Sequence, residues 1–166
     1  MGAVREFESV TSFIVHLARA ELAVRVAAHH ALDQAAKIIE DDAKAQLGHY
    51  QQEAGPFNAW PELADSTKAD RRSAGFPEDE PLLRTGALRN SISREVQGDE
   101  AAVGSTSEIA VYQELGTEKI PPRPFLGPAA FKNKDRIEAL LGQAVVNALE
   151  YGEVGSFVAL PGLSKP

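Results

Sequence analysis

The sequence predicts an α+β protein in which a long N-terminal helix and a C-terminal helix pack on a small, mainly antiparallel sheet. Three observations support this fold class. An amphipathic stretch without Gly or Pro fills residues 10–47, two short strand-like segments flank a Gly-Asp pair, and a run of prolines leads into a second helical pattern at residues 128–152. We expect residues 1–152 to form one domain and residues 153–166 to form a flexible tail.

The N-terminal helix is predicted from apolar residues that recur every three or four positions from Val10 to Leu47. Ser9 or Thr11 is expected to cap its start, and Gly48 to end it. A helix of about 38 residues is roughly 57 Å long, which exceeds the roughly 30 Å diameter of a compact domain of this size. The helix therefore either breaks, or projects at one end and packs on something else. Its alanine-rich middle would let a partner helix approach closely, but an ordinary long helix on its own sheet explains the pattern equally well.

Residues 48–80 are rich in Pro and Gly and carry three basic and seven acidic side chains. A stretch of about 30 residues is too long for a simple connection, so we expect it to be functional, mobile or partly structured. Phe57, Trp60 and Leu63 are expected to pin it to the body of the protein. Residues 66–72 are expected to form one or two helical turns.

Residues 92–97 and 100–105 are predicted to pair as an antiparallel hairpin, with Gly98 as the first residue of a type II′ turn. The register stays open, because Arg94 has the same parity as the apolar residues expected on the buried face, which are Ile92, Val96, Ala101 and Val103.

A short helix is expected after the hairpin, capped by Ser107 and ended by Gly116. Its apolar residues are Ile109, Val111, Tyr112 and Leu115. Prolines at positions 121, 122 and 124 then impose an extended course, and Pro128 suits the first position of the C-terminal helix. That helix is expected to end near Gly152 and to present one apolar stripe made of Phe131, Ile137, Leu141, Ala144, Val145 and Ala148.

The composition excludes several function classes. The chain has no cysteine, which removes disulfides, cysteine nucleophiles and thiolate zinc sites. Its net charge of −7 repels nucleic-acid phosphates and anionic lipid, so neither is expected as a direct partner. Residues 1–10 lack the basic start of a signal peptide, and charged residues interrupt the most apolar stretch, which argues against a membrane span and favours the cytoplasm.

No catalytic, metal or cofactor site is expected. Residues 40–42 and 78–80 are acidic runs that we interpret as solvated faces, and the sequence contains no serine-elbow, Walker or dinucleotide motif. A metal-dependent hydrolase that uses the carboxylates of residues 40–42 is the least favoured alternative. The histidines lack metal-ligand spacing and are expected at the surface; they are His16, His29, His30 and His49.

Two segments are more distinctive. In residues 81–92, Thr85-Gly86 makes a tight turn or cap, and Leu88 is spaced four residues from Ile92 so that both can dock on one face. In residues 112–128, Glu114 is expected to pair with Arg123 or Arg84 and so to fix the stiff proline segment against the body.

Three basic residues near the start of the last helix, Lys132, Lys134 and Arg136, are expected on a solvated face. Their second interpretation is a subunit contact, because an acidic region at residues 48–80 and a slightly basic C-terminal part would suit head-to-tail association.

The motifs LLRTGALRNSI, VGSTSEIAVYQELGT and KIPPRPFLGPA, in this order, resemble the tail-component family of long-tailed bacteriophages. Members of that family also occur in prophages and are described as tail-completion or head–tail joining proteins. The resemblance covers residues 81–131, and the helices on both sides also fit. It implies a non-enzymatic subunit, made in the host bacterial cytoplasm, that forms a ring, commonly a hexamer, at the head–tail junction of the virion beside other neck or tail-tube proteins.

The resemblance also implies which residues specify the fold, some of them at subunit contacts: Thr85, Gly86, Leu88, Arg89, Ser91, Glu114, Gly116, Thr117, Pro122, Arg123, Pro124 and Phe125. An alternative of another class is a regulatory protein-binding module that acts through residues 48–80.

Overall fold

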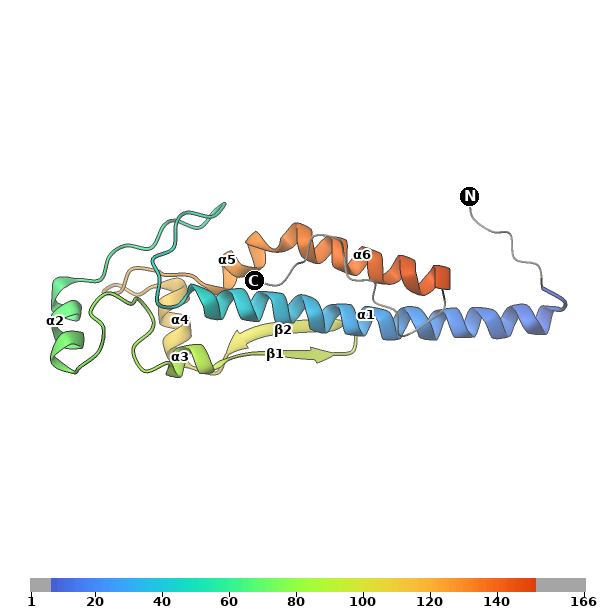
Figure 1. The fold of residues 1–166 in the computed structure, drawn as a ribbon, viewed down its shortest axis with the longest axis horizontal. Helices are drawn as coiled ribbons and strands as arrows, with labels where there is room; N and C mark the ends of the chain where they lie inside the picture. Colours follow the sequence, from blue (N-terminus) through green and yellow to red (C-terminus); the bar gives the residue numbers. More distant parts are fainter. Residues whose placement is uncertain (1–6, 152–166) are drawn as a thin grey trace.

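The computed structural model describes residues 7–151 and has the α+β architecture expected from the sequence. The order of elements is α1 (Val10–Gln46), α2 (Asp65–Ser73), α3 (Ala87–Asn90), β1 (Ile92–Gln97), β2 (Glu100–Ser105), α4 (Glu108–Leu115), α5 (Leu126–Lys132) and α6 (Lys134–Tyr151). Helix α1 is the axis of an elongated molecule, with the β1–β2 hairpin along one side and α6 along another (Figure 1). The tail expected at residues 153–166 lies outside the described residues.

Helix α1 is unbroken over its 37 residues. Ser9 caps it through a reciprocal pair, in which the Ser12 amide donates to Ser9 Oγ and the Ser9 amide donates to Ser12 Oγ, each at 3.1 Å. The helix ends where Gly48 takes a φ of +100° and its amide donates to the Pro81 carbonyl at 2.8 Å. Both expected boundaries are therefore confirmed.

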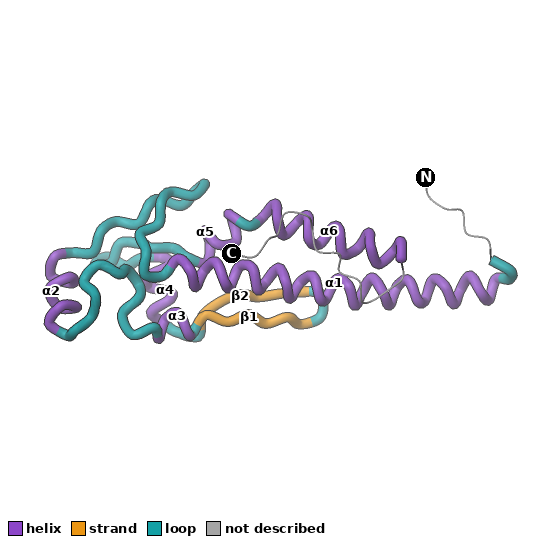
Figure 2. Tube along the Cα trace, viewed as in Figure 1, coloured by secondary structure: helices purple, strands orange, loops and turns teal. Residues whose placement is uncertain are grey.

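The N-terminal part of α1 projects beyond the rest of the protein, as Figures 1 and 2 show. No residue from 10 to 22 is buried, and Ala23 is the first buried residue of the helix. Of the two outcomes expected for an over-long helix, the structure takes the second, in which one end extends past the body.

The main core lies at the C-terminal end of α1. Phe125 and Ile92 have the largest fully buried side chains together with Pro81. Trp60 is also buried there, so the expectation that it pins residues 48–80 to the body is confirmed. The other buried members of this cluster are Ala43, Leu47, Leu88, Ala110 and Ala129.

Helices α1 and α6 pack together along the middle of α1. Small side chains make this close approach possible, so the alanine-rich middle of α1 receives a helix of the same chain. The buried alanines are Ala23, Ala31, Ala35 and Ala36 on α1 and Ala144 and Ala148 on α6.

The predicted C-terminal helix differs from the structure in three ways. It is divided at Asn133, whose side-chain amide donates to Asp42 Oδ2 at 3.1 Å and to the Ala129 carbonyl at 2.9 Å. Pro128 is the third residue of α5 rather than the first. Its missing N–H costs nothing there, because the N–H groups of the first helical turn have no acceptor within the helix. The predicted stripe is partly wrong, since Phe131 and Val145 are exposed.

The hairpin has the predicted strands, and its pairing places Arg94 opposite Val103 and Val96 opposite Ala101. Gly98 has a φ of +60°, as the first position of a type II′ turn requires. Ala101 is exposed, contrary to the prediction, because the end of the hairpin near the turn is less covered than its start at Ile92.

Arg94 faces α1 and explains the ambiguous register. Its Nε donates to Asp33 Oδ1 at 2.8 Å and its Nη1 donates to Glu40 Oε2 at 2.7 Å. Glu40 also accepts from Lys44 Nζ at 2.5 Å and is buried, so the prediction of a solvated acidic face is wrong for this residue. These ion pairs hold β1 against α1 on the face of the hairpin that was expected to carry apolar side chains.

We predict that Arg94→Met lowers the free energy of unfolding by about 1–3 kcal/mol, because it leaves the buried Glu40 carboxylate with one cation instead of two. The Glu40 side chain is 11% exposed and that of Arg94 29% exposed, so solvent screens the pair only partly. Arg25→Met is the matched control, since the Arg25–Glu21 pair is more than 70% exposed on both sides and its loss should change stability by less than about 0.5 kcal/mol. Urea unfolding of both variants measures the difference, and equal effects would contradict the assignment.

A pH dependence follows from the same carboxylate. Hydrogen bonds from Lys44 and then from Arg94 hold the pKa of Glu40 below its ordinary value of 4.5. Because the folded state has the lower pKa, this stabilisation is complete above about pH 4.5 and is lost as the pH falls through the folded-state pKa.

We therefore expect Glu40→Gln to lose about 1–2 kcal/mol of stability near pH 7 and progressively less below about pH 4.5. Urea unfolding of the wild type and the variant between pH 3 and pH 7 measures this gap. A gap that stays constant over that range would show that the charge of Glu40 contributes nothing.

Candidate functional site

The segment from Thr85 to Ser91 builds the turn that leads into β1. Gly86 has a φ of +81° at the start of α3, a conformation that favours glycine, and Thr85 Oγ1 accepts from the Ala87 amide at 3.3 Å. Leu88 enters the core. The Ser91 hydroxyl donates to the Leu88 carbonyl at 2.7 Å and lies 2.7 Å from the Ser105 hydroxyl, which ties the start of β1 to the end of β2. Arg89 is exposed.

Glu114 caps helix α5 instead of pairing with an arginine. Its Oε2 accepts from the amides of Phe125 and Leu126 at 2.8 and 3.1 Å, and its Oε1 accepts from the Gly127 amide at 2.8 Å. The predicted pair with Arg123 or Arg84 is therefore wrong, because the unbonded amides at the start of a helix attract the carboxylate. Glu114 nevertheless fixes the end of the proline segment, as predicted, but through backbone amides rather than through an arginine.

Gly116 and Thr117 shape the loop between α4 and the proline segment. Gly116 has a φ of +75°, and a Cβ there would lie 2.9 Å from the Pro122 ring, so only glycine fits without displacement. Thr117 Oγ1 accepts from the amides of Lys119 and Ile120 at 3.2 and 3.0 Å. These contacts fold the chain back so that the Arg123 amide donates to the Gln113 carbonyl at 2.7 Å.

The proline segment holds the region of residues 48–80 in place. The guanidinium of Arg123 is buried and donates to the carbonyls of Pro61 and Glu62 at 2.9–3.1 Å. Trp60 Nε1 donates to the Pro124 carbonyl at 2.9 Å. One of the motifs that carry the phage resemblance, KIPPRPFLGPA, thus holds residues 60–62 in place.

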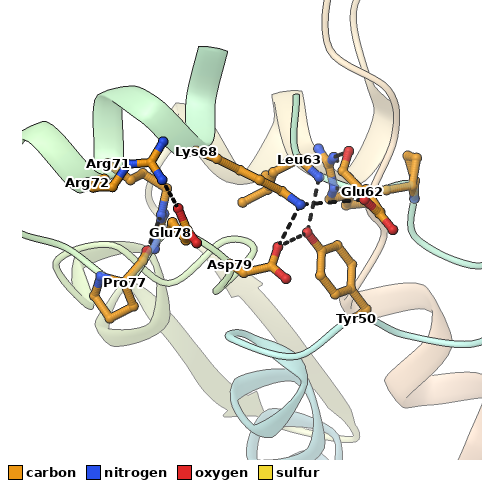
Figure 3. A network of polar contacts seen from close by, with 11 residues as sticks. Tyr50, Glu62, Leu63, Lys68, Arg71, Arg72, Pro77, Glu78 and Asp79 are labelled. Carbon is orange, nitrogen blue, oxygen red and sulfur yellow. Dashed lines mark hydrogen bonds and ion pairs between the residues drawn. The ribbon is translucent and has the colours of Figure 1, made fainter. Parts of the chain in front are cut away.

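A polar network also organises residues 48–80 (Figure 3). The Tyr50 hydroxyl donates to Asp79 Oδ1 at 2.5 Å and accepts from the Leu63 amide at 3.1 Å, while Lys68 Nζ lies 3.3 Å from the same carboxylate oxygen. Arg72 pairs with Glu78 at 2.8 Å. Burial and then the bond to Asp79 raise the pKa of Tyr50, and the bond from Tyr50 lowers the pKa of Asp79. Glu78 and Asp79 of the acidic run at residues 78–80 are therefore engaged with basic partners of their own region.

A cavity of about 540 Å³ lies where this region meets α3, α4 and the proline segment. Four of the residues singled out by sequence line it: Thr85, Gly86, Leu88 and Arg123. Two polar lining residues, Arg71 and Gln113, are among those that the sequence did not mark as site residues. Arg71 lies in a strongly charged helix where nothing in the pattern marks it for burial, and Gln113 lies in a short helix next to Glu114, where its amide does not stand out.

Large apolar side chains are exposed on several elements. They lie on the projecting part of α1, on α4 near the opposite end of α1, and on α5 and α6, where Phe131, Val146 and Leu149 are exposed (Figure 1). Helix α4 buries only Ala110 and exposes the four apolar residues predicted for it, Ile109, Val111, Tyr112 and Leu115. Lys132, Lys134 and Arg136 are exposed as predicted, and Lys134 lies 3.7 Å from Glu138.

Within residues 7–151, no three His, Asp or Glu side chains lie close enough together to hold a metal ion. At the acidic run 40–42, Asp41 accepts from Lys37 at 2.7 Å and Asp42 accepts from Asn133, in addition to the contacts of Glu40. None of the helices described in that range has both the length and the hydropathy that a membrane span requires.

Comparison of the chain with protein-family models, with curated proteins and with solved structures gives no match.

We predict that Glu114→Gln lowers the free energy of unfolding by about 1–2 kcal/mol, because a neutral amide oxygen replaces a carboxylate that accepts from three backbone amides. Glu118→Gln, an exposed acidic residue four positions later, is the control and should change stability by less than about 0.5 kcal/mol. Chemical unfolding of the two variants tests this. A Glu114→Gln variant as stable as the control would remove the capping role.

Proposed function

We propose that the chain is a non-enzymatic assembly subunit of a long-tailed phage or prophage, a tail-completion or head–tail joining protein that associates with copies of itself in a ring. The observation that carries the proposal is the uncovered apolar stripe on the projecting part of α1. The ordered motifs at residues 81–131 supply the phage context, as a resemblance.

The stripe continues the face that is buried farther along the same helix. Val10, Phe13, Ile14 and Leu17 recur at helical spacing in line with the buried Ala31 and Ala35, yet they are 76%, 43%, 58% and 50% exposed. An amphipathic helix keeps such a face where something covers it. Within residues 7–151 the Phe7 ring packs on Phe13, but all four stripe residues keep the exposure given above, so further cover is expected from a neighbouring molecule.

The exposed apolar residues of α4 support one kind of association. The stripe on α1 and helix α4 lie at different ends of the described part of the molecule (Figure 1). A contact that joins one surface of a subunit to a different surface of the next is heterologous, and repeating it gives a ring when the rotation closes. The exposed basic residues Lys132, Lys134 and Arg136 are further candidates for contact with an acidic neighbour.

The strength of such a contact fits assembly on a template. Covering the four stripe residues would contribute on the order of 5 kcal/mol from apolar burial. Association itself costs roughly 4–15 kcal/mol in lost freedom of motion. A single contact is therefore weak, and a ring is stable only when several contacts form together, for example on the end of a phage tail. The subunit would be made in the host cytoplasm and end in the virion.

The alternative of a regulatory module acting through residues 48–80 has less support, because Arg123, Trp60 and the Tyr50 network bind this region to the body of the protein. A metal-dependent hydrolase has less still, because each carboxylate of residues 40–42 has a protein partner.

We expect Leu17→Glu to lower the fraction of the protein that binds to tails at least tenfold. The unfolding free energy of the variant should stay within about 0.5 kcal/mol of the wild type. The reason is that a charge placed in the stripe must be desolvated when a neighbour covers it. The measurement is co-sedimentation with tails from the phage or prophage that encodes the chain, combined with size-exclusion chromatography and light scattering.

Arg19→Glu is the control, because it lies on the opposite side of the same exposed helical segment and changes the net charge by a larger amount. It should add to tails like the wild type. A wild-type chain that stays monomeric and never adds to tails would contradict the proposed function. An equal loss of tail binding in both variants would contradict the role of the stripe.

A further inference from the structure

The cavity between residues 48–80, α3, α4 and the proline segment combines apolar walls with buried positive charge. Its apolar lining includes Leu63, Leu82, Leu88, Ile109 and Ile120. Its volume of about 540 Å³ lies within the range of ligand pockets, about 300–1,000 Å³.

Two arginines in its walls are buried without a counter-charge. Arg71 and Arg123 are each 5% exposed, and both line the cavity. The Arg71 guanidinium donates to the carbonyls of Pro77 and Leu83 at 2.7 and 2.6 Å, and Arg123 donates only to backbone carbonyls as well. Among residues 7–151 no carboxylate lies within 4.0 Å of either side chain.

This arrangement is unusual within the protein itself. Arg72, Arg84 and Arg94 are all more exposed than these two, and each pairs with a carboxylate. A buried charge without a counter-charge is costly, and burial lowers the pKa of Arg123 for this reason. Carbonyl oxygens compensate only part of the cost, so the two buried guanidinium groups favour an anion in the cavity.

Both buried arginines keep a donor group without a partner. The Nη1 groups of Arg71 and Arg123 have no acceptor within the described residues. A ligand that satisfies both must bring negative charge. Three other charged residues line the cavity: Lys119 adds positive charge, Arg84 pairs with Asp70, and Glu62, whose side chain is 83% exposed, is engaged by Lys68.

We propose that this cavity binds the C-terminal residue of a partner protein, with an apolar side chain at that last position. A terminal residue carries its α-carboxylate and its side chain on one carbon atom. One residue can therefore present a carboxylate to the arginines and an apolar group to the leucines. An aspartate or glutamate within a chain lacks this combination, because its carboxylate occupies the side chain that the apolar walls would receive.

The inference goes beyond the proposed function, because the binding is a property of the isolated chain whether or not it assembles on a phage tail. The experiment uses three synthetic probes and isothermal titration calorimetry: N-acetyl-Ala-Leu-Leu with a free C-terminal carboxylate, the same peptide as a C-terminal amide, and N-acetyl-Ala-Leu-Glu amide. We expect the free carboxylate to bind at least about tenfold more tightly than either amide, the factor that one charge-assisted hydrogen bond supplies.

Ala87→Trp blocks the cavity from an exposed lining position, and Ala69→Trp places the same side chain on an exposed position of α2 outside the lining. The first should lower the affinity for the free-carboxylate peptide at least about tenfold and the second should leave it unchanged, with both variants as stable as the wild type in thermal unfolding. Equal binding of the acid and its amide, or no binding of any probe, would overturn the proposal. Tighter binding of the glutamate amide, or of inorganic phosphate in a parallel titration, would overturn the assignment to a chain terminus.

Discussion

The backbone of residues 123–127 is the constraint on which the rest of the structure depends. This segment is buried at Arg123 and Phe125 but cannot join a sheet, because Pro124 lacks an N–H group and the neighbouring elements are helices and loops. Buried backbone groups must nevertheless be hydrogen-bonded. The partners come from three distant parts of the chain: Gln46 at the end of α1 donates to the Phe125 carbonyl, Trp60 donates to the Pro124 carbonyl, and Glu114 of α4 accepts from the amides at the start of α5.

These bonds explain why a short hairpin and a few helices suffice for a defined fold. The two-stranded sheet is small, and Arg94 attaches it to α1 through Asp33 and Glu40. The larger task, joining α1, residues 48–80 and α4, falls to the end of the proline segment and the first residues of α5. Pro124 restricts the backbone there, and side chains that satisfy the polar groups of the segment fix its position.

The sequence was sufficient where the signal is local. The helix start at Ser9, its end at Gly48, the turn at Gly98 and the strands on either side all follow from capping and turn chemistry within a few residues. It was insufficient where distant groups decide. The partner of Glu114 could not be predicted. The three backbone amides that bind it instead of an arginine come close to Glu114 only in the folded chain.

The candidate site shows the same limit. The motif residues were recognisable, and four of them do line one cavity, but their meeting with Arg71 depends on how residues 48–80 return to the body. Arg71 is one of several charged residues in α2, and its burial results from the carbonyls of Pro77 and Leu83, which periodicity does not reveal.

The projecting part of α1 has a consequence for the order in which the protein loses structure. An isolated helix of a dozen residues is marginal in water because its first turn is costly to nucleate. Here the anchored part of α1 supplies the nucleus, so the projecting turns only extend an existing helix. Backbone amides should therefore exchange with solvent along a gradient, fastest near residues 13–16 and slowest beside α6. The Ser9–Ser12 cap and the packing of the Phe7 ring on Phe13 oppose this fraying at the tip. The number of helical turns in the projecting part of α1 can therefore vary. A molecule that covers this part would determine how many of those turns stay folded.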